Sequence, residues 1–210
     1  MSEISAFILD FKKYKAELLK SWLVSRVEKE KLTSDQKIFS QFIRYFVFEK
    51  FFDISPVFSI TNSKPYLANG SLFFNISHTQ DQIVMTVSNS EVGIDAEEVN
   101  KTRNILKIAK RYFDTNEYAS LVQNSQQSVD FYTLWTLKEA QVKRSSLGIA
   151  KELREAIFYK NENQQWLSEK YQNDFVTVFH NDLVISICCE NIMQKQISFF
   201  EIDNFEFKKV

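Results

Sequence analysis

Hydrophobic positions along the chain change between the period of a strand and the period of a helix, which predicts a mixed α+β fold. Residues 4–10 form an apolar run typical of a first strand, and residues 12–31 carry apolar side chains at helical spacing. Ser34 is a suitable N-cap for a second helix, which we expect to end near Phe52. Short strands are then predicted over residues 72–77, 82–88 and 92–97.

The second half of the chain repeats this change from strand to helix. Residues 103–113 have an amphipathic helical pattern, and Asp114 and Glu117 resemble a capping box that opens another helix. A long helix is predicted over 125–146, with Gly148 as its stop. Further strands are predicted over 156–159, 175–180, 183–189 and 196–203, with a hairpin turn at 181–182. We therefore expect two similar halves, residues 1–92 and 93–210.

The composition is that of a globular protein and excludes several classes of function. Hydrophobic residues make up 44% and charged residues 25% of the chain, and 26 basic residues against 27 acidic ones leave no basic surface for general nucleic-acid binding. No apolar run approaches the roughly 20 residues of a membrane span. The first residues lack a signal-peptide pattern, and the two adjacent cysteines exclude a disulfide framework, so we expect a cytoplasmic protein.

Glycine and histidine are scarce, which limits how phosphate or metal could be bound. The only glycines are Gly70, Gly93 and Gly148, so no glycine-rich phosphate loop or dinucleotide fingerprint can form. The only histidines are His78 and His180, which excludes a multi-histidine zinc site. Phosphate binding would therefore depend on other side chains and a metal ion.

Three acids are the strongest candidates for holding that metal. Asp95 and Glu97 are two residues apart on a predicted strand, so they face the same side. Glu139 lies in the long predicted helix, with Trp135 and Lys143 four residues before and after it. Each feature alone also fits a plain alternative, a solvated strand end or a Glu–Lys surface pair. We expect the three carboxylates to converge on one hard divalent cation.

The order of four short motifs narrows the interpretation. Lys64-Pro65 is followed by Phe74-Asn75-Ile76-Ser77-His78, then by Gly93-Ile94-Asp95-x-Glu97, and then by Trp135-x-x-Lys138-Glu139-Ala140-x-x-Lys143. The adjacent Ser77 and His78 would point apart on a strand, and no nucleophile elbow is present, which argues against a Ser/His hydrolase. The four motifs together resemble the 4′-phosphopantetheinyl transferases of the Sfp type, over about residues 64–148.

The resemblance implies a pseudo-two-fold α+β fold and a transferase that moves the phosphopantetheine arm of coenzyme A to a serine of an acyl or peptidyl carrier protein. Adenosine 3′,5′-bisphosphate would be released. The chain would act as a monomer, with coenzyme A and Mg²⁺ bound between the two halves.

The resemblance also implies roles for individual residues. Asp95, Glu97 and Glu139 match the magnesium ligands. The residues that match contacts to coenzyme A are Lys64, Ser77, His78, Lys138 and Lys143. We expect Glu139 and Lys143 to be catalytic. Lys143 would neutralise phosphate charge, and the base would be Glu139 or a magnesium-bound water held by Glu97 or Glu139.

Two basic regions have expected binding roles. Candidates for holding the 3′-phosphate of coenzyme A are Lys29, Lys31, Lys37 and Arg44. A second set shares one helical face and could dock an acidic carrier protein, although a solvated face is an equal alternative: Arg103, Lys107, Lys110 and Arg111. Two other functions stay open, a non-catalytic module that binds coenzyme A or a carrier protein and a magnesium-dependent hydrolase of pyrophosphate bonds.

Overall fold

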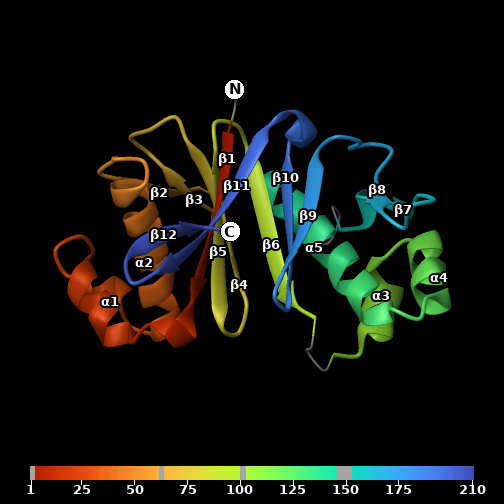
Figure 1. Ribbon diagram of the computed structural model, residues 1–210, viewed down its shortest axis with the longest axis horizontal. Helices are drawn as coiled ribbons and strands as arrows, with labels where there is room; N and C mark the ends of the chain where they lie inside the picture. Colours follow the sequence, from red (N-terminus) through yellow and green to blue (C-terminus); the bar gives the residue numbers. More distant parts are fainter. Residues whose placement is uncertain (1–2, 62–63, 100–102, 146–152) are drawn as a thin grey trace. The chain divides into compact units, whose positions relative to one another are not determined.

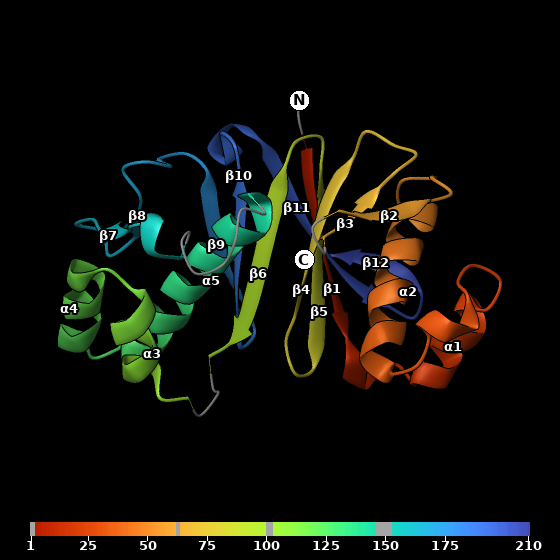
Figure 2. The ribbon, with the colours of Figure 1, turned by 180° about the vertical axis from the view of Figure 1, so that it is seen from behind.

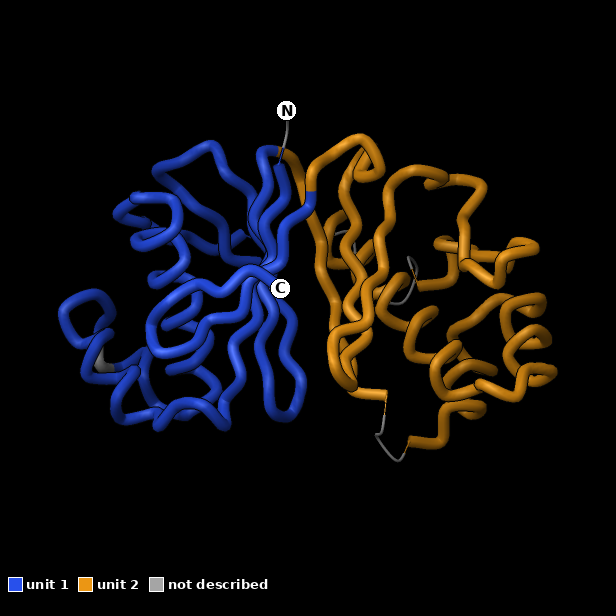
Figure 3. Tube along the Cα trace, viewed as in Figure 1, with its two compact units in different colours: residues 1–89, 197–210 blue, residues 90–196 orange. Residues whose placement is uncertain are grey.

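The computed structural model describes residues 3–61, 64–99, 103–145 and 153–210. Helices and antiparallel sheets are both present, so the prediction of a mixed α+β fold is confirmed (Figure 1). The chain divides into two compact units (Figure 3). Unit 1 contains residues 1–89 and 197–210, and unit 2 contains residues 90–196.

Unit 1 is built on a five-stranded sheet. Its strand order is β12-β11-β1-β5-β4, and β5 pairs antiparallel with both β1 and β4. A separate antiparallel pair is formed by β2 and β3. The strands are β1 (Glu3–Asp10), β2 (Phe58–Thr61), β3 (Lys64–Leu67), β4 (Phe73–His78), β5 (Gln82–Ser88), β11 (Gln196–Asp203) and β12 (Glu206–Lys209); the helices are α1 (Ala16–Leu23) and α2 (Asp35–Lys50), with 3₁₀ turns at Phe11–Lys13 and Lys29–Lys31.

Aromatic side chains fill the core of unit 1. Helix α1 packs on α2, and α2 packs on β5 (Figure 1). On β1, the ring of Phe7 lies 4.9 Å from that of Phe51 and stacks at 5.5 Å on Phe200 of β11. The ring of Phe207 on β12 approaches Phe7 to 5.6 Å. The C-terminal hairpin is therefore held in this core by ring contacts as well as by strand pairing.

The unit boundaries differ from the division expected at residues 92 and 93. That division falls at the start of a strand of unit 2, and the last residues of the chain belong to unit 1. The reason is the place of β1, which lies between β11 and β5 in the sheet. A strand gives no sign in its own sequence of which distant strand it will pair with.

Unit 2 is a three-stranded antiparallel sheet covered by helices. The strand order is β6-β10-β9, and α5 packs against all three strands (Figure 2). Its elements are β6 (Val92–Glu98), α3 (Ile105–Tyr112), α4 (Thr115–Gln123), α5 (Gln127–Ser145), β7 (Tyr159–Lys160), β8 (Trp166–Leu167), β9 (Phe175–His180), β10 (Leu183–Cys189) and a 3₁₀ turn at Ile192–Gln194. Its core is formed by the inner faces of α3, α4 and α5, including the fully buried Phe131 and Tyr132.

Most predicted elements are confirmed, and the differences have local causes. The Ser34 side chain accepts a hydrogen bond from the backbone N–H of Lys37 and caps α2. The capping box of Asp114 and Glu117 is present on α4. The helix predicted over 12–31 is wrong in length, because the α-helix within it, α1, ends at Leu23 and is followed only by a 3₁₀ turn at Lys29–Lys31. Leu18, one of the apolar residues at helical spacing in this segment, is 52% exposed and does not join the core.

Two further differences concern short strands. The pair β2–β3 was missed because proline and polar residues interrupt its pattern, and the strand predicted over 156–159 is reduced to β7. Gly148, the predicted stop of α5, lies outside the described residues. In the part of the chain that the structure describes, no helix has the length and apolar character required to cross a bilayer.

Candidate active site

Gly93 brings strand β6 and helix α5 unusually close together. A Cβ atom at this position would lie 2.0 Å from the carbonyl oxygen of Ala140 and 2.6 Å from the backbone nitrogen of Arg144. Any other residue would push the helix away from the strand. Because side chains alternate along a strand, Asp95 and Glu97 share the face of Gly93, the face that α5 covers.

The two strand acids are each paired with a cation in this structure. Asp95 is buried, and its Oδ1 accepts from the Lys143 ammonium at 2.7 Å. The Oε1 atom of Glu97 accepts from the Arg103 guanidinium at 3.0 Å. These pairs offset part of the negative charge that two neighbouring carboxylates bring to one face of β6.

Glu139 lies in the same electrostatic environment as the strand acids. Burial raises the pKa of Glu139 to about 7, and the nearby Asp95 carboxylate adds to this effect. Lys143 acts in the opposite direction, and Glu97 raises the pKa further. The carboxylates from β6 and α5 are therefore close enough to repel one another, as expected for neighbours on facing elements.

The acids do not enclose a metal as they stand. Among the described residues, no three His, Cys, Asp or Glu side chains lie close enough together to hold a metal ion. The donor set nevertheless fits Mg²⁺, which prefers carboxylate oxygens and needs few of them from the protein. Asp95 and Glu97 are instead paired with Lys143 and Arg103. The metal-ligand set Asp95, Glu97 and Glu139 stays a prediction.

Lys138 requires a correction, because it is fully buried. Its ammonium lies 2.9 Å from Glu117 Oε2 and donates to the carbonyl oxygens of Leu153 and Ala156. Burial lowers the pKa of Lys138 even though Glu117 acts to raise it. An ammonium with these partners and no exposure cannot approach coenzyme A. The buried pairing of Lys138 was not predicted from the sequence. Lys138 and Glu139 are adjacent on α5 and therefore point to different sides of the helix.

Glu117 completes a junction of three segments. Its Oε2 also accepts from the backbone N–H of Asp114 at 2.7 Å, and its Oε1 accepts from that of Phe158 at 2.8 Å. Lys138 belongs to α5, Glu117 to α4, and Phe158 to the segment before β7. The pair therefore holds α5 against its neighbours at the position next to Glu139.

The remaining predicted residues lie in unit 1. Lys64 begins β3, and Ser77 and His78 end β4. Ser77 is buried whereas His78 is exposed, as expected for adjacent strand residues. His78 lines a cavity of about 600 Å³ within this unit, together with Pro65, the residue after Lys64.

This cavity combines a basic side with an apolar wall. The cations that line it are Arg26, Lys31, Lys37 and Arg44, against the two acids Glu28 and Glu30. The apolar wall is formed by Tyr45, Phe58, Ile60 and Pro65. The hairpin β2–β3 supplies most of this wall, and because that hairpin was not predicted, the wall was missed in the sequence. Ile60 is 74% exposed, which leaves an apolar surface open at the cavity.

Arg44 is a partly buried cation of the cavity. Its guanidinium carbon lies 5.4 Å from the centre of the Phe58 ring, and its Nε donates to the Ser40 carbonyl oxygen at 2.9 Å. Burial lowers the pKa of Arg44 to about 10, so the side chain still carries its charge at neutral pH. A cation held over an aromatic ring beside open apolar surface suits a ligand that has both phosphate and a flat ring.

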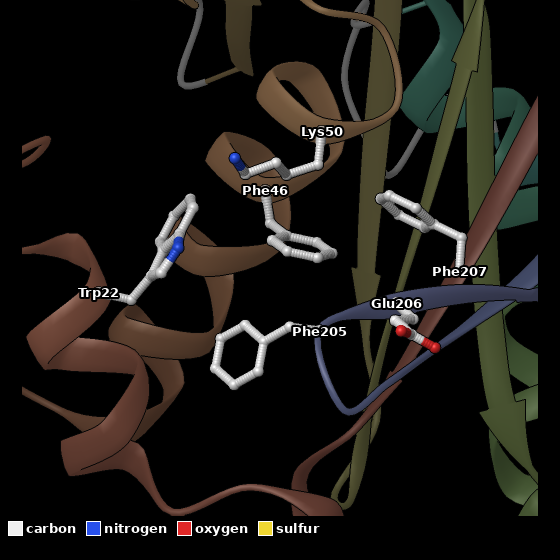
Figure 4. Close-up of a pocket in the computed structure, with 6 residues that line it drawn as sticks. All are labelled: Trp22, Phe46, Lys50, Phe205, Glu206 and Phe207. Carbon is white, nitrogen blue, oxygen red and sulfur yellow. The ribbon is translucent and has the colours of Figure 1, made fainter.

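A second cavity of unit 1 has a different character. Its volume is about 630 Å³, and the rings of Trp22, Phe46 and Phe205 line it (Figure 4). Lys50 and Glu206 are its charged residues, and none of the site residues predicted from the sequence lines it. This cavity therefore has no proposed role in substrate binding or catalysis.

Basic residues gather on the exposed side of helix α3. Lys107, Lys110 and Arg111 are exposed on this helix, which has no acid in its first turn, and Arg103 lies just before it. Arg154 joins them, because its guanidinium donates to the Arg111 carbonyl oxygen at 3.4 Å. We call Arg103, Lys107, Lys110, Arg111 and Arg154 the basic face of α3.

Comparison with known proteins points to one family. Residues 91–188 match the model of the 4′-phosphopantetheinyl transferase superfamily. A 4′-phosphopantetheinyl transferase, gsp, of Aneurinibacillus migulanus is 33% identical over 129 residues, which is 60% of this chain and 53% of the relative. The psf-1 transferase of Bacillus pumilus is 38% identical over 92 residues, 42% of this chain and 39% of the relative.

The transferase Sfp of Bacillus subtilis (strain 168) is 38% identical over 80 residues, which is 37% of this chain and 34% of the relative. The chain thus spans from about a third to about half of the length of these relatives. The stretch of this chain that matches the family model contains Asp95, Glu97, Glu139 and Lys143.

Proposed function

We propose that the chain transfers phosphopantetheine from coenzyme A to a serine of an acyl or peptidyl carrier protein, because residues 91–188 match the model of the 4′-phosphopantetheinyl transferase superfamily. The observation that carries this proposal is the close approach of β6 and α5 at Gly93. It brings Asp95 into contact with Lys143 and into the electrostatic environment of Glu139. The pseudo-two-fold relation of the halves stays a prediction.

The acids and the lysine between β6 and α5 each have a proposed role in the transfer. The serine oxygen forms a bond to the phosphorus that carries the pantetheine arm, while the bond from that phosphorus to the bisphosphate breaks. Lys143 offsets charge on the phosphate oxygens after it leaves Asp95. Glu139 receives the serine proton as the candidate general base. Mg²⁺ held by Asp95, Glu97 and Glu139 would supply further charge neutralisation.

The cavity of unit 1 that contains Arg44 is the proposed site for the nucleotide end of coenzyme A. Its apolar wall suits a purine ring. Lys37 and Arg44 supply positive charge for phosphate, while Arg26 and Lys31 are paired with Glu49 and Glu28. Lys31, Lys37 and Arg44 are three of the residues expected from the sequence to hold the 3′-phosphate. Lys29, the fourth, has no described side chain and is left out of the assignment.

The direct test is to incubate the protein with coenzyme A, Mg²⁺ and several apo-carrier proteins and to weigh the products. A carrier that gains one phosphopantetheine, and no longer gains it after addition of a chelator, would support the proposal. A module that only binds coenzyme A would leave every carrier at its starting mass. Free phosphopantetheine released without a carrier would instead favour a hydrolase.

Replacing Arg44 with Gln should weaken the binding of coenzyme A. Loss of a charge-assisted contact to phosphate is worth about 1.5–3 kcal/mol, so the apparent KM for coenzyme A should rise about 10- to 100-fold. Steady-state kinetics with varied coenzyme A measure this. Lys50→Gln is the matched control, since Lys50 is on the same helix but lines the other cavity. Equal effects of the two substitutions would contradict the assignment.

Replacing Lys107 and Lys110 with Glu should weaken the binding of the carrier protein without affecting that of coenzyme A. An acidic carrier would lose attraction to the basic face of α3, so its apparent KM should rise about tenfold while that of coenzyme A stays the same. The effect should shrink as salt is added. Lys20→Glu, an exposed change on α1, serves as control. Equal increases in both KM values would argue against docking on this face.

A further inference from the structure

The ion pair between Arg103 and Glu97 joins two features that have separate proposed roles. Arg103 precedes the N-cap of α3 and belongs to the basic face, whereas Glu97 is a predicted metal ligand on β6. Their side chains meet at 3.0 Å between Nη1 and Oε1. One cation therefore touches both the surface proposed for a carrier protein and the acids proposed for a metal.

This pair competes with metal binding at Glu97. A carboxylate oxygen that accepts from a guanidinium must release it, or share it, to coordinate a cation. Asp95 is in a similar position with Lys143, but that lysine is on α5 with Glu139 and is only 28% exposed. The side chain of Arg103 is 37% exposed, while that of Glu97 is 13% exposed. Arg103 is therefore the partner that an incoming molecule can reach.

Breaking the Arg103–Glu97 ion pair to form new contacts would cost little free energy. Ion pairs at this degree of exposure contribute weakly to stability, because solvent screens them and side-chain order opposes them. An acidic group of a docked partner would offer Arg103 an equivalent contact. Glu97 would then turn to a divalent cation without leaving a buried charge unpaired.

We propose that Arg103 couples docking of an acidic carrier protein to metal binding. In the chain alone, Arg103 holds Glu97 and weakens the affinity for a divalent cation. A carrier that binds the basic face of α3 draws Arg103 away and releases Glu97 for the metal. By reciprocity, bound metal strengthens carrier binding by the same factor. Arg103 acts here as a positioning residue, and this inference rests on the proposed function.

The test measures metal affinity without any turnover. Calorimetric titration with Mg²⁺, in the absence of coenzyme A and carrier, should give Arg103→Gln a Kd about two- to fivefold lower than wild type, the factor expected for an exposed ion pair. Lys107→Gln removes the same charge from the same basic face but lies one helical turn further on. Its Kd should change less, by under about twofold.

A second titration tests the coupling itself. Addition of a saturating apo-carrier protein should lower the Mg²⁺ Kd of wild type and of Lys107→Gln, but not that of Arg103→Gln. A metal-only Kd of Arg103→Gln equal to that of wild type, or a carrier-induced decrease of the same size in Arg103→Gln and Lys107→Gln, would overturn the coupling even if the protein transfers phosphopantetheine. Conversely, the expected Kd pattern in a protein that transfers nothing would preserve the coupling and overturn the proposed function.

Discussion

Replacing Glu139 with Gln should abolish phosphopantetheine transfer and, in the absence of metal, make the protein more stable. The loss of transfer follows because the proposed proton acceptor and one predicted metal ligand disappear together. We expect kcat to fall by about 100-fold or more. Mass measurement of the carrier protein after incubation with coenzyme A gives this result directly.

The gain in stability follows from the pKa of Glu139. Burial and the Asp95 carboxylate raise this pKa from 4.5 to about 7, so the folded state holds the proton more tightly than the unfolded state. Stability of the metal-free protein is therefore lost as the pH rises from 4.5 to about 7, and the full penalty is present above that range. A neutral glutamine avoids the penalty. We expect a gain of about 1–2 kcal/mol at pH 8 and almost none at pH 4.5.

Urea unfolding in the presence of a chelator, at pH 8 and at pH 4.5, measures this change in the free energy of unfolding. Added Mg²⁺ should stabilise wild type at pH 8 but have little effect on the variant. Glu91→Gln, an exposed change just before β6, is the control and should alter neither transfer nor stability. A Glu139→Gln protein that is less stable than wild type at pH 8, or that still transfers at the wild-type rate, would refute the role assigned to Glu139.

Replacing Lys138 with Met should destabilise the fold strongly. The substitution leaves Glu117 buried and charged, with the exposed fraction of its side chain at 0%. Removal of one member of a buried pair costs about 3–5 kcal/mol, because the other charge stays in the protein interior without compensation. Urea unfolding monitored by tryptophan fluorescence measures this change in the free energy of unfolding.

A double variant separates the charge effect from the packing effect. Glu117→Gln combined with Lys138→Met removes both charges, so its unfolding free energy should lie closer to wild type than that of Lys138→Met alone. If Lys138 instead contacted coenzyme A, the single variant would keep its stability and show a raised KM for coenzyme A. That outcome would restore the role first inferred from the sequence.

The fit of β6 and α5 illustrates what sequence patterns reveal well. Asp95 and Glu97 were expected on one face of a strand, and Glu139 and Lys143 on one helix, because both inferences depend only on local periodicity. Gly93 was one of three glycines, and its sequence context did not show why glycine is needed. The requirement comes from the carbonyl oxygen of Ala140, 47 positions away along the chain, which a Cβ atom at Gly93 would approach to 2.0 Å.

The sequence by itself determined most of the helices and strands, the α+β class and the residue types that can bind phosphate and a divalent cation. It did so because hydrophobic periodicity, caps and short motifs act over a few residues. Only the tertiary structure decided that Lys138 is enclosed with Glu117, that Arg103 reaches Glu97, and that the C-terminal hairpin completes the sheet of unit 1. Each of these depends on burial or pairing between segments distant in the chain, and burial sets whether a charged side chain faces a ligand or another residue.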